Sequence, residues 1–288
     1  MSDVAAVGAM LAESLPYIQR HAGSTVVVKY GGNAIAGSDG PSAVGDFAAD
    51  VALLRAVGLR PVVVHGGGPQ ISEWMSRLGI EPVFSGGLRV TDAATMEIVQ
   101  MVLLGIVNPM LVTAINAHGV RATGISGQDG GVLRTAPRDP ALGRVGEIVA
   151  VDDTVLQAIM GADAVPVVAT VGVGDDGALY NVNADEAAAA IAVAVGASKL
   201  IYLTDVAGVR RDRSDPSSII SRASRDEVAR LVESGAADGG MIPKLLECIT
   251  AVDGGVGAAH VLDGTARHAL LIELFTDGGI GTMITEAG

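Results

Sequence analysis

The stretch VVVKYGGNAI, residues 26–35, ends an apolar run with a lysine and two glycines. The valines predict a buried β-strand at 25–29, and Lys29 places a cation at its end. Gly31 and Gly32 leave no side chains there, so backbone N–H groups can approach an anion closely. The stretch therefore predicts a strand of an α/β fold with an anion site at its end. A strand-ending turn with a lysine that reaches into water is the alternative.

Apolar strand-like runs alternate with helix-like segments along the rest of the chain. Continuous Val/Ile/Leu strands separated by helices are typical of a parallel sheet covered on both faces. Segments 126–150 and 172–183 are richer in glycine and predict hairpins or loops on the sheet. With no long linker and no internal repeat, one α/β domain over 1–288 is expected. The predicted strands are 25–29, 61–65, 120–125, 165–171, 199–204, 258–264 and 280–285, and the predicted helices are 42–57, 70–78, 92–118, 184–196, 225–234 and 243–253.

The composition limits the classes of ligand and the location. The 288 residues carry a formal net charge of -13, which argues against nucleic acid and anionic membranes as partners, because both attract clustered cations. The single cysteine, Cys248, cannot form an internal disulfide, so a reduced, cytoplasmic setting is expected. The N-terminus lacks the basic region of a signal peptide, and the longest apolar run, 187–198, is too short to span a bilayer and predicts a buried helix.

A second glycine-rich stretch, HGGGPQIS at 65–72, follows the second predicted strand. In open parallel sheets, ligands bind beyond the carboxyl ends of the strands. Pro69 suits the first turn of a helix, so the glycines precede a helix N-terminus, where anions are favoured. A flexible turn is the alternative. His65 is expected to orient this loop rather than to perform chemistry.

The stretch NVNADE, 181–186, opens a predicted helix. Asn183 suits the N-cap, and Glu186 would complete a capping box. Asp185 could simply stabilise the helix dipole. Asn181 precedes the helix and has no such explanation, so Asn181 and Asp185 are candidate functional residues.

Two further cations stand in unusual places. Lys244, in GGMIPK at 239–244, lies at the start of a predicted helix, where a cation is unfavourable unless an anion offsets it. Arg89, in GLRVTD at 87–92, offers a planar fork that suits a carboxylate.

Other catalytic motifs are absent or poorly placed. Neither GxxxxGK[ST] nor GxSxG occurs, and the histidines and the cysteine have no metal-site spacing. The GxGxxG match, GVGDDG at 172–177, opens no convincing helix, and its two aspartates would face a pyrophosphate. It predicts a turn, and it leaves a dinucleotide oxidoreductase as a weak alternative.

The motifs together resemble the acetylglutamate kinases of the amino acid kinase family, from about residue 4 to 286. The resemblance implies a three-layer αβα sandwich of the amino acid kinase or carbamate kinase type, on a mainly parallel sheet of about eight strands. It implies ATP-dependent phosphorylation of the side-chain carboxylate of N-acetyl-L-glutamate to N-acetyl-L-glutamyl 5-phosphate, in arginine biosynthesis. Mg²⁺ would be held mainly by the phosphates, and no protein metal site is expected. The matching motifs are KYGGNA, VHGGGPQI, GLRVTD, YNVNADEAA, KLIYLTDVAGV, GGMIPK and HALLIELFTDGGIGTMI.

The resemblance also implies residue roles. Lys29 and Lys244 would stabilise the transferred phosphoryl group, and Asp185 would position both lysines. Because the attacking carboxylate is already a nucleophile, no general base is required, and positioning and charge carry the catalysis. Arg89 would bind the α-carboxylate of the substrate. The other implied contacts are Gly67, Gly68 and Asn181 for acetylglutamate, and Gly31, Gly32 and Asn33 for the nucleotide phosphates.

The N-terminal segment predicts an amphipathic helix in residues 1–22. An ordinary helix packed on its own domain is one interpretation, and the resemblance implies the other, an assembly helix. In arginine-inhibited members of the family such a helix joins dimers into a hexamer, so a homohexamer (a trimer of dimers) inhibited by L-arginine is expected. The rest would divide into an acetylglutamate lobe at about 23–180 and an ATP lobe at about 181–288. The apolar face of the helix contains Val4, Val7, Leu11, Leu15 and Ile18, with Pro16 predicted to kink it. The implied arginine site is an H-x4-E-x5-G pattern with two more residues: His268, Glu273, Gly279, Lys199 and Tyr17.

Two positions depart from the family pattern, since Gln128 and Pro109 stand where lysine is common. They leave open a kinase of a free or carrier-linked aminoadipate derivative, because one methylene changes binding by only about 1–3 kcal/mol. A carrier-linked substrate would favour a basic docking surface, and the acidic composition of this chain gives no sign of one. A non-catalytic arginine sensor with the same fold is a further alternative, and retention of both lysines and Asp185 argues against it.

Overall fold

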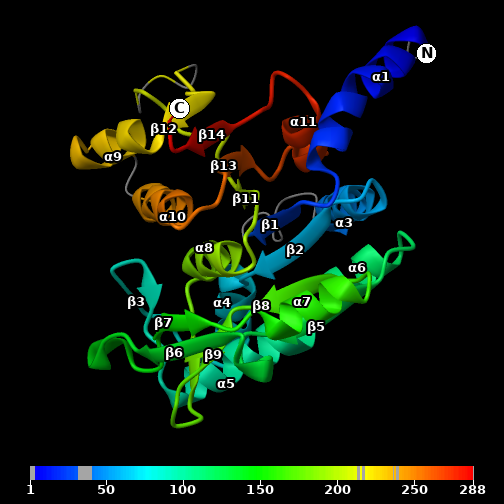
Figure 1. Cartoon of the computed structure of the whole chain (residues 1–288). Helices are drawn as coiled ribbons and strands as arrows, with labels where there is room; N and C mark the ends of the chain where they lie inside the picture. Colours follow the sequence, from blue (N-terminus) through cyan, green and yellow to red (C-terminus); the bar gives the residue numbers. More distant parts are fainter. Residues whose placement is uncertain are drawn as a thin grey trace.

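The computed structural model describes residues 4–31, 41–212, 215, 218–235, 237 and 240–287. Its centre is an eight-stranded sheet in the order β12-β14-β13-β11-β1-β2-β8-β5 (Figure 1). Every neighbouring pair is parallel except β13 and β14. The predicted mainly parallel sheet is therefore confirmed. The strands are β1 (Thr25–Tyr30), β2 (Arg60–His65), β5 (Ala122–Ser126), β8 (Val165–Ala169), β11 (Lys199–Thr204), β12 (Arg222–Ser224), β13 (Ala258–Asp263) and β14 (Thr282–Thr285).

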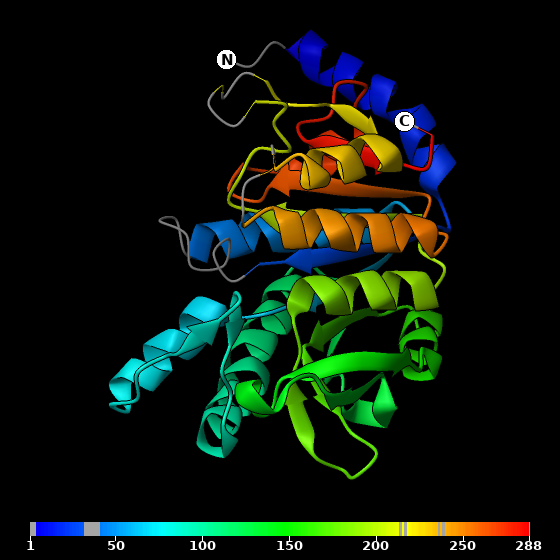
Figure 2. The same cartoon turned by 90° about the vertical axis from the view of Figure 1, so that its left-hand side faces the viewer.

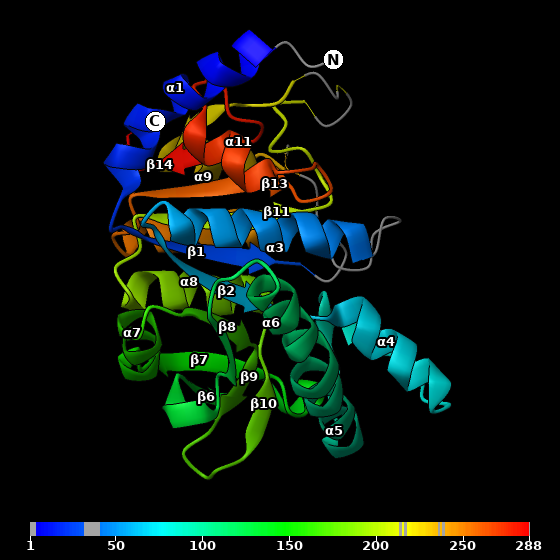
Figure 3. The same ribbon diagram turned by 90° about the vertical axis from the view of Figure 1, so that its right-hand side faces the viewer.

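Helices cover both faces of this sheet, which gives the predicted three layers. Figure 2 shows α8, α9 and α10 on one side, and Figure 3 shows α3, α6 and α11 on the other. Each face encloses its own aliphatic cluster. The helices are α1 (Val4–His21), α3 (Pro41–Ala56), α4 (Gly68–Arg77), α5 (Ala93–Val102), α6 (Asn108–Asn116), α7 (Thr154–Gly161), α8 (Ala184–Ala194), α9 (Arg225–Glu233), α10 (Ile242–Asp253) and α11 (Ala269–Phe275).

The alternation of side chains along β1 determines where Lys29 points. Val26 and Val28 pack in the cluster that includes α3 and α6, and Val27 packs in the cluster that includes α8 and α10. Successive side chains of a strand face opposite sides. Lys29 therefore shares the side of Val27 and faces α8.

The strand order places three loops at one edge. β11, β1 and β2 are adjacent and parallel, so their carboxyl ends meet there. The loops after β1 and β2 are the two glycine-rich stretches that the sequence singled out. The strands from residues 23–180 form one half of the sheet and those from 181–288 the other. The lobe roles stay a prediction.

A smaller sheet of order β10-β9-β6-β7 lies at the lower left of the molecule in Figure 1. The glycine-rich segments 126–150 and 172–183 contribute most of it, so the expected hairpins are confirmed, and GVGDDG contributes the turn between β9 and β10. The predicted strand 165–171 is wrong as one element, because β8 and β9 belong to different sheets. The remaining strands are β3 (Phe84–Ser85), β4 (Leu88–Arg89), β6 (Leu133–Pro137), β7 (Gly146–Val151), β9 (Val171–Val173) and β10 (Leu179–Asn181).

The predicted helix 92–118 is a composite of α5, a π-helical turn at Leu103–Val107, and α6. The stretch Ala93–Asn116 is long and apolar enough to cross a membrane by length and composition alone. Leu103, Leu111 and Ile115, however, lie in the core cluster beneath it. In this fold it serves as a core helix.

The predicted N-terminal helix is present as α1, with Pro16 inside it. It projects from the body of the domain (Figure 1). Leu15 is exposed, whereas Ile18 packs against the core.

Candidate active site

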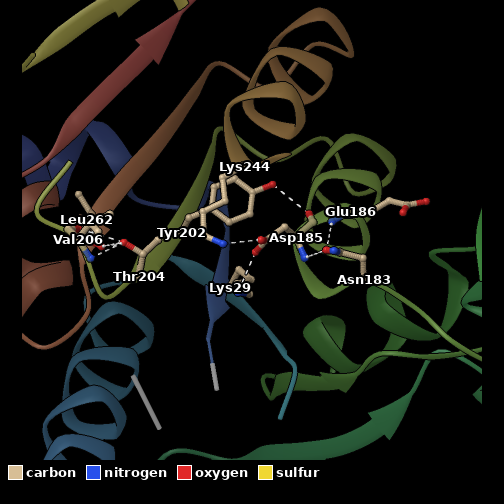
Figure 4. Close-up of polar contacts among 9 residues, drawn as sticks. All are labelled: Lys29, Asn183, Asp185, Glu186, Tyr202, Thr204, Val206, Lys244 and Leu262. Carbon is tan, nitrogen blue, oxygen red and sulfur yellow. Dashed lines mark hydrogen bonds and ion pairs between the residues drawn. The ribbon is translucent and has the colours of Figure 1, made fainter. Parts of the chain in front are cut away.

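The carboxylate of Asp185 lies between two lysines. Lys29 Nζ is 2.8 Å from Asp185 Oδ1, and Lys244 Nζ is 2.7 Å from Asp185 Oδ2 (Figure 4). The two lysines come from β1 and α10, far apart in sequence. The group of three has a net charge of +1 and can attract an anion such as a phosphate. The structure thus brings together all three residues predicted to be catalytic.

Burial strengthens the ion pairs within this group. Asp185 and Lys29 are each 8% exposed. Burial pushes the pKa of Asp185 upward, but the charges and hydrogen bonds of Lys29 and Lys244 outweigh it and hold the pKa below the ordinary value. The carboxylate stays ionised and can keep both ammonium groups in place.

Neighbouring groups fix the start of α8. The side chain of Asn183 accepts hydrogen bonds from the backbone N of Asp185 and Glu186, so the predicted N-cap is confirmed. Tyr202, from β11, donates its hydroxyl to the carbonyl of Asp185 at 3.0 Å. The predicted capping box is not completed, because the Glu186 carboxylate binds Arg138 at 2.5 Å and the backbone N of Ile148.

The position of Lys244 in the first turn of α10 has an explanation in the same contact. A cation there is unfavourable for the helix dipole. The offsetting anion is the Asp185 carboxylate of α8, which packs beside α10. The lysine is therefore held at the sheet edge rather than released to water.

Gly31 lies against the Lys29 ammonium group. A Cβ at Gly31 would stand 3.2 Å from Lys29 Nζ and 3.2 Å from the carbonyl oxygen of Leu203. Both contacts are tighter than ordinary van der Waals distance, so any larger residue at this position would press on the Lys29 ammonium group. Gly32 and Asn33, the other predicted phosphate contacts, lie outside the described residues.

The predicted substrate residues line one pocket of about 170 Å³ beside this centre. Its wall includes the start of α4, the β3–β4 hairpin and the start of α8. Asn181 is tied to the wall through its amide, which donates to Thr91 Oγ1 at 3.2 Å. The predicted residues on the wall are Gly67, Gly68, Arg89 and Asn181.

Arg89 is a buried cation in that pocket. Its guanidinium donates to the carbonyl of Gly68 at 2.9 Å and to the hydroxyl of Ser72 at 2.8 Å, and it stacks 4.7 Å from the Phe84 ring centre. Burial lowers its pKa. Among the residues that the structure describes, no carboxylate pairs with Arg89. A buried guanidinium fixed by neutral groups is suited to an incoming carboxylate.

His65 holds the glycine-rich loop in place through contacts of both ring nitrogens. Its Nδ1 lies 3.0 Å from the carbonyl oxygen of Gly66, and its Nε2 lies 3.0 Å from the amide nitrogen of Asn108. Full burial lowers the pKa of His65 to about 4, so the ring is neutral. Nδ1 then donates to Gly66 while Nε2 accepts from Asn108, which fixes the glycine loop against α6. Sequence reasoning missed Asn108.

The Thr204 hydroxyl, at the end of β11, fixes the loop that follows this strand. Thr204 Oγ1 accepts from the backbone N of Val206 at 3.1 Å and lies 3.2 Å from the carbonyl oxygen of Leu262 (Figure 4). The third loop at this edge of the sheet therefore has a defined shape.

A second cavity, of about 430 Å³, lies where α1 meets α11 and the loop before β14. Four of the five residues predicted for an arginine site line it: Tyr17, Lys199, Glu273 and Gly279. Gly279 has a φ of +56°, and a Cβ there would stand 2.7 Å from Glu273 Oε2, so this position requires glycine.

His260, which sequence reasoning missed, links the charged groups of this cavity. Its Nδ1 is 2.6 Å from Glu273 Oε1, and its Nε2 is 3.0 Å from Lys199 Nζ. Burial lowers the pKa of both His260 and Lys199. Burial raises the pKa of Glu273, but the hydrogen bond and charge of His260 help to bring it below the ordinary value.

His268 is the fifth predicted residue, and the structure places it elsewhere. It lies just before α11 with a φ of 56°, and its Nδ1 is 2.6 Å from Asp50 Oδ1 on α3. Because α11 starts only after His268, the H-x4-E spacing does not put His268 and Glu273 on one helical face. His268 instead joins α11 to α3.

Gln128 and Pro109, the two departures from the family pattern, are absent from the wall of the substrate pocket. Gln128 precedes the short 3₁₀ turn Asp129–Gly131, and Pro109 stands in the first turn of α6.

The chain is similar to known proteins over most of its length. A model of the amino acid kinase family matches residues 24–263. The acetylglutamate kinase of Symbiobacterium thermophilum is 52% identical over 287 residues, which cover 96% of this chain and 97% of that one.

Two solved structures of an N-acetylglutamate synthase from Neisseria gonorrhoeae share the fold. One, complexed with coenzyme A and N-acetyl-glutamate, has a TM-score of 0.84 at 30% identity, and the other, complexed with coenzyme A and L-arginine, has 0.80 at 27%. Each alignment covers 96% of this chain but only 63% and 65% of the synthase, so this chain spans under two thirds of that protein. The family match and the relative that aligns over almost its whole length agree with the motifs and with the paired lysines. The chain therefore belongs to the amino acid kinase family of phosphotransferases.

Proposed function

We propose that this chain transfers the γ-phosphoryl group of ATP to the side-chain carboxylate of N-acetyl-L-glutamate, in the cytoplasm, as a step of arginine biosynthesis. The observation that carries the proposal is the Lys29–Asp185–Lys244 group beside a pocket that holds a buried arginine, which pairs with no carboxylate among the described residues. Relatives named acetylglutamate kinase support the choice of substrate.

The geometry suits a reaction between two anions. Arg89 would hold the α-carboxylate, so that the side-chain carboxylate points toward the lysines. A carboxylate oxygen attacks the γ-phosphorus, and the bond from that phosphorus to the β,γ-bridging oxygen breaks, leaving ADP with the negative charge. Lys29 and Lys244 would lower the repulsion on approach and stabilise the charge in the transition state. No side chain has to remove a proton.

The residues present fit the phosphates of a nucleoside triphosphate. The excess positive charge of the lysine group suits phosphate oxygens, and so does the lack of a side chain at Gly31, beside Lys29 Nζ. In the described part of the chain, no group of three or more His, Cys, Asp or Glu side chains forms a metal site. Mg²⁺ would therefore be held mainly by the phosphates, where it adds charge neutralisation when bound.

A coupled ADP-release assay with Mg-ATP tests the substrate. The acids to compare are N-acetyl-L-glutamate, N-acetyl-L-aminoadipate, glutamate and aspartate. We expect acetylglutamate to give the highest kcat/KM. Preference for the aminoadipate derivative would replace this proposal with the homologous kinase. No turnover of any acid by folded protein would favour a non-catalytic sensor.

The second cavity suits free L-arginine as a regulator. Charged residues of both signs line this cavity. Glu273 and Asp277 offer anions for a guanidinium, and Lys199 and Arg222 offer cations for a carboxylate. The volume of about 430 Å³ lies in the range typical of small-molecule sites. The similar synthase complexed with L-arginine supports this choice. We infer feedback inhibition by arginine at this cavity.

His260→Gln is expected to weaken inhibition by arginine about tenfold or more, because Glu273 loses a charge-assisted hydrogen bond that holds it toward the cavity. His268→Gln is the matched comparison, since the same side chain is removed from a site outside the cavity. We expect it to change the inhibitory concentration less than about twofold. The measurement is the arginine concentration at half inhibition. Equal effects of the two substitutions would contradict the placement of the site.

We also propose that α1 joins copies of this chain into a homohexamer. Its exposed Leu15 and its projection from the domain support an intermolecular contact. Light scattering of the full chain and of a variant lacking residues 1–22 tests this. A hexamer that persists without the helix would overturn the proposal.

A further inference from the structure

Glu247 is a carboxylate beside the lysine group that the proposed reaction does not use. It lies on α10 three residues after Lys244, so the two side chains share one helical face. The residue is partly buried, and within the described ranges its carboxyl group makes no hydrogen bond and no ion pair. A desolvated carboxylate without partners is unfavourable in its ionised form.

The neighbours of Glu247 make ionisation harder still. Burial raises its pKa most, the charges of Glu186 and Asp185 raise it further, and Arg138 opposes them, so the pKa reaches about 7. Tyr202 and Cys248 also face this cluster and stay neutral, because burial raises the pKa of both. Glu247 therefore gains and loses a proton near neutral pH.

The protonation of Glu247 changes the net charge of the centre. When Glu247 is ionised, three cations and three carboxylates cancel, and when it is protonated the cluster has a net charge of +1. Asp185 touches both lysines and Glu186 touches Arg138, and the charges of Asp185, Glu186 and Arg138 all act on Glu247. The six groups are Lys29, Lys244, Arg138, Asp185, Glu186 and Glu247.

We propose that Glu247 is a positioning carboxylate whose ionisation weakens nucleotide binding, by cancelling the excess positive charge that Lys29 and Lys244 present to the phosphates. The inference rests on the proposed role of these lysines in phosphate binding. The nucleotide is an anion and favours the protonated form of Glu247. By linkage, nucleotide binding is then accompanied by uptake of a proton.

Titration calorimetry with the non-hydrolysable analogue Mg-AMP-PNP tests this in the full chain. We expect the Kd of the wild-type chain to rise about three- to tenfold between about pH 6 and about pH 8. Glu247→Gln should keep the tighter Kd at both pH values. Glu233→Gln is the matched control, because it removes the same charge from an exposed position of α9. Repeating the titration in buffers of different ionisation enthalpy measures proton uptake. Glu247→Gln should show no such uptake.

A second readout does not depend on ligand. The folded-state pKa of Glu247 lies above its ordinary value of 4.5, so this group lowers the free energy of unfolding as pH rises from about 4.5 to about 7. Glu247→Gln should therefore raise Tm more at about pH 8 than at about pH 5.

The outcomes separate this inference from the proposed function. The same Kd for wild type and Glu247→Gln at both pH values, with equal proton uptake, would overturn the role of Glu247. A Kd that stays unchanged when Lys244 is replaced by methionine would instead overturn the assignment of the phosphate site, and the inference with it.

Discussion

Lys244→Met is expected to lower kcat roughly 10²–10³-fold, the effect of removing one preorganised donor from a transition state. The substitution leaves Asp185 with a single lysine, Lys29, and takes the local charge from +1 to zero. The developing charge on the transferred phosphoryl group then loses one of its two ammonium partners. Steady-state kcat with saturating acetylglutamate and Mg-ATP is the measurement.

The control for this substitution is Arg121→Met, which removes one positive charge from an exposed position just before β5. It should leave kcat within about twofold of wild type. Tm should be compared for both variants, so that loss of fold is not mistaken for loss of catalysis. A Lys244→Met enzyme that is folded and retains most of its kcat would remove Lys244 from the catalytic group.

Arg89→Met is expected to lower kcat/KM for acetylglutamate roughly 10²-fold or more. Loss of one partner of a buried charge pair costs about 2–5 kcal/mol, which corresponds to this range. The guanidinium contacts Gly68 and Ser72 and stacks on Phe84, and it leaves its remaining donors for the substrate carboxylate. The loss should lie mainly in KM, because Arg89 holds a carboxylate that does not react.

Two comparisons sharpen the Arg89 prediction. Arg89→Lys keeps the charge but loses the planar fork, so it should restore only a small part of the lost kcat/KM. The Kd for Mg-AMP-PNP should stay within about twofold of wild type in both variants, because the nucleotide contacts lie at the lysines. An unchanged KM for acetylglutamate in Arg89→Met would show that another group binds the α-carboxylate.

Local sequence pattern was enough to predict the sheet edge that carries this site. Valine runs determine β1 and β2, and glycine after each strand marks the place where a ligand can approach the backbone. The cation in the first turn of α10 was a local conflict with the helix dipole, and the structure resolves it through Asp185. Such conflicts are visible in a sequence because each violates a rule of local structure.

Contacts set by tertiary packing could not be predicted in the same way. The run at 165–171 is uniformly apolar, so nothing in it marks the change from β8 to β9 between two sheets. His260 meets Glu273 because β13 packs beside α11, whereas the sequence spacing favoured His268. Glu247 looked like any polar residue of a helix, and only the packing of α8 against α10 surrounds it with charge.

Trapping the reaction product with hydroxylamine tests the central claim most directly, because an acyl phosphate is converted to a hydroxamate at the carboxyl group that was phosphorylated. The account predicts that the wild-type chain, given Mg-ATP and N-acetyl-L-glutamate, forms the side-chain hydroxamate at the rate of ADP release. Lys244→Met should form it roughly 10²–10³-fold more slowly. ADP release without hydroxamate, or a hydroxamate at the α-carboxyl group, would contradict the account.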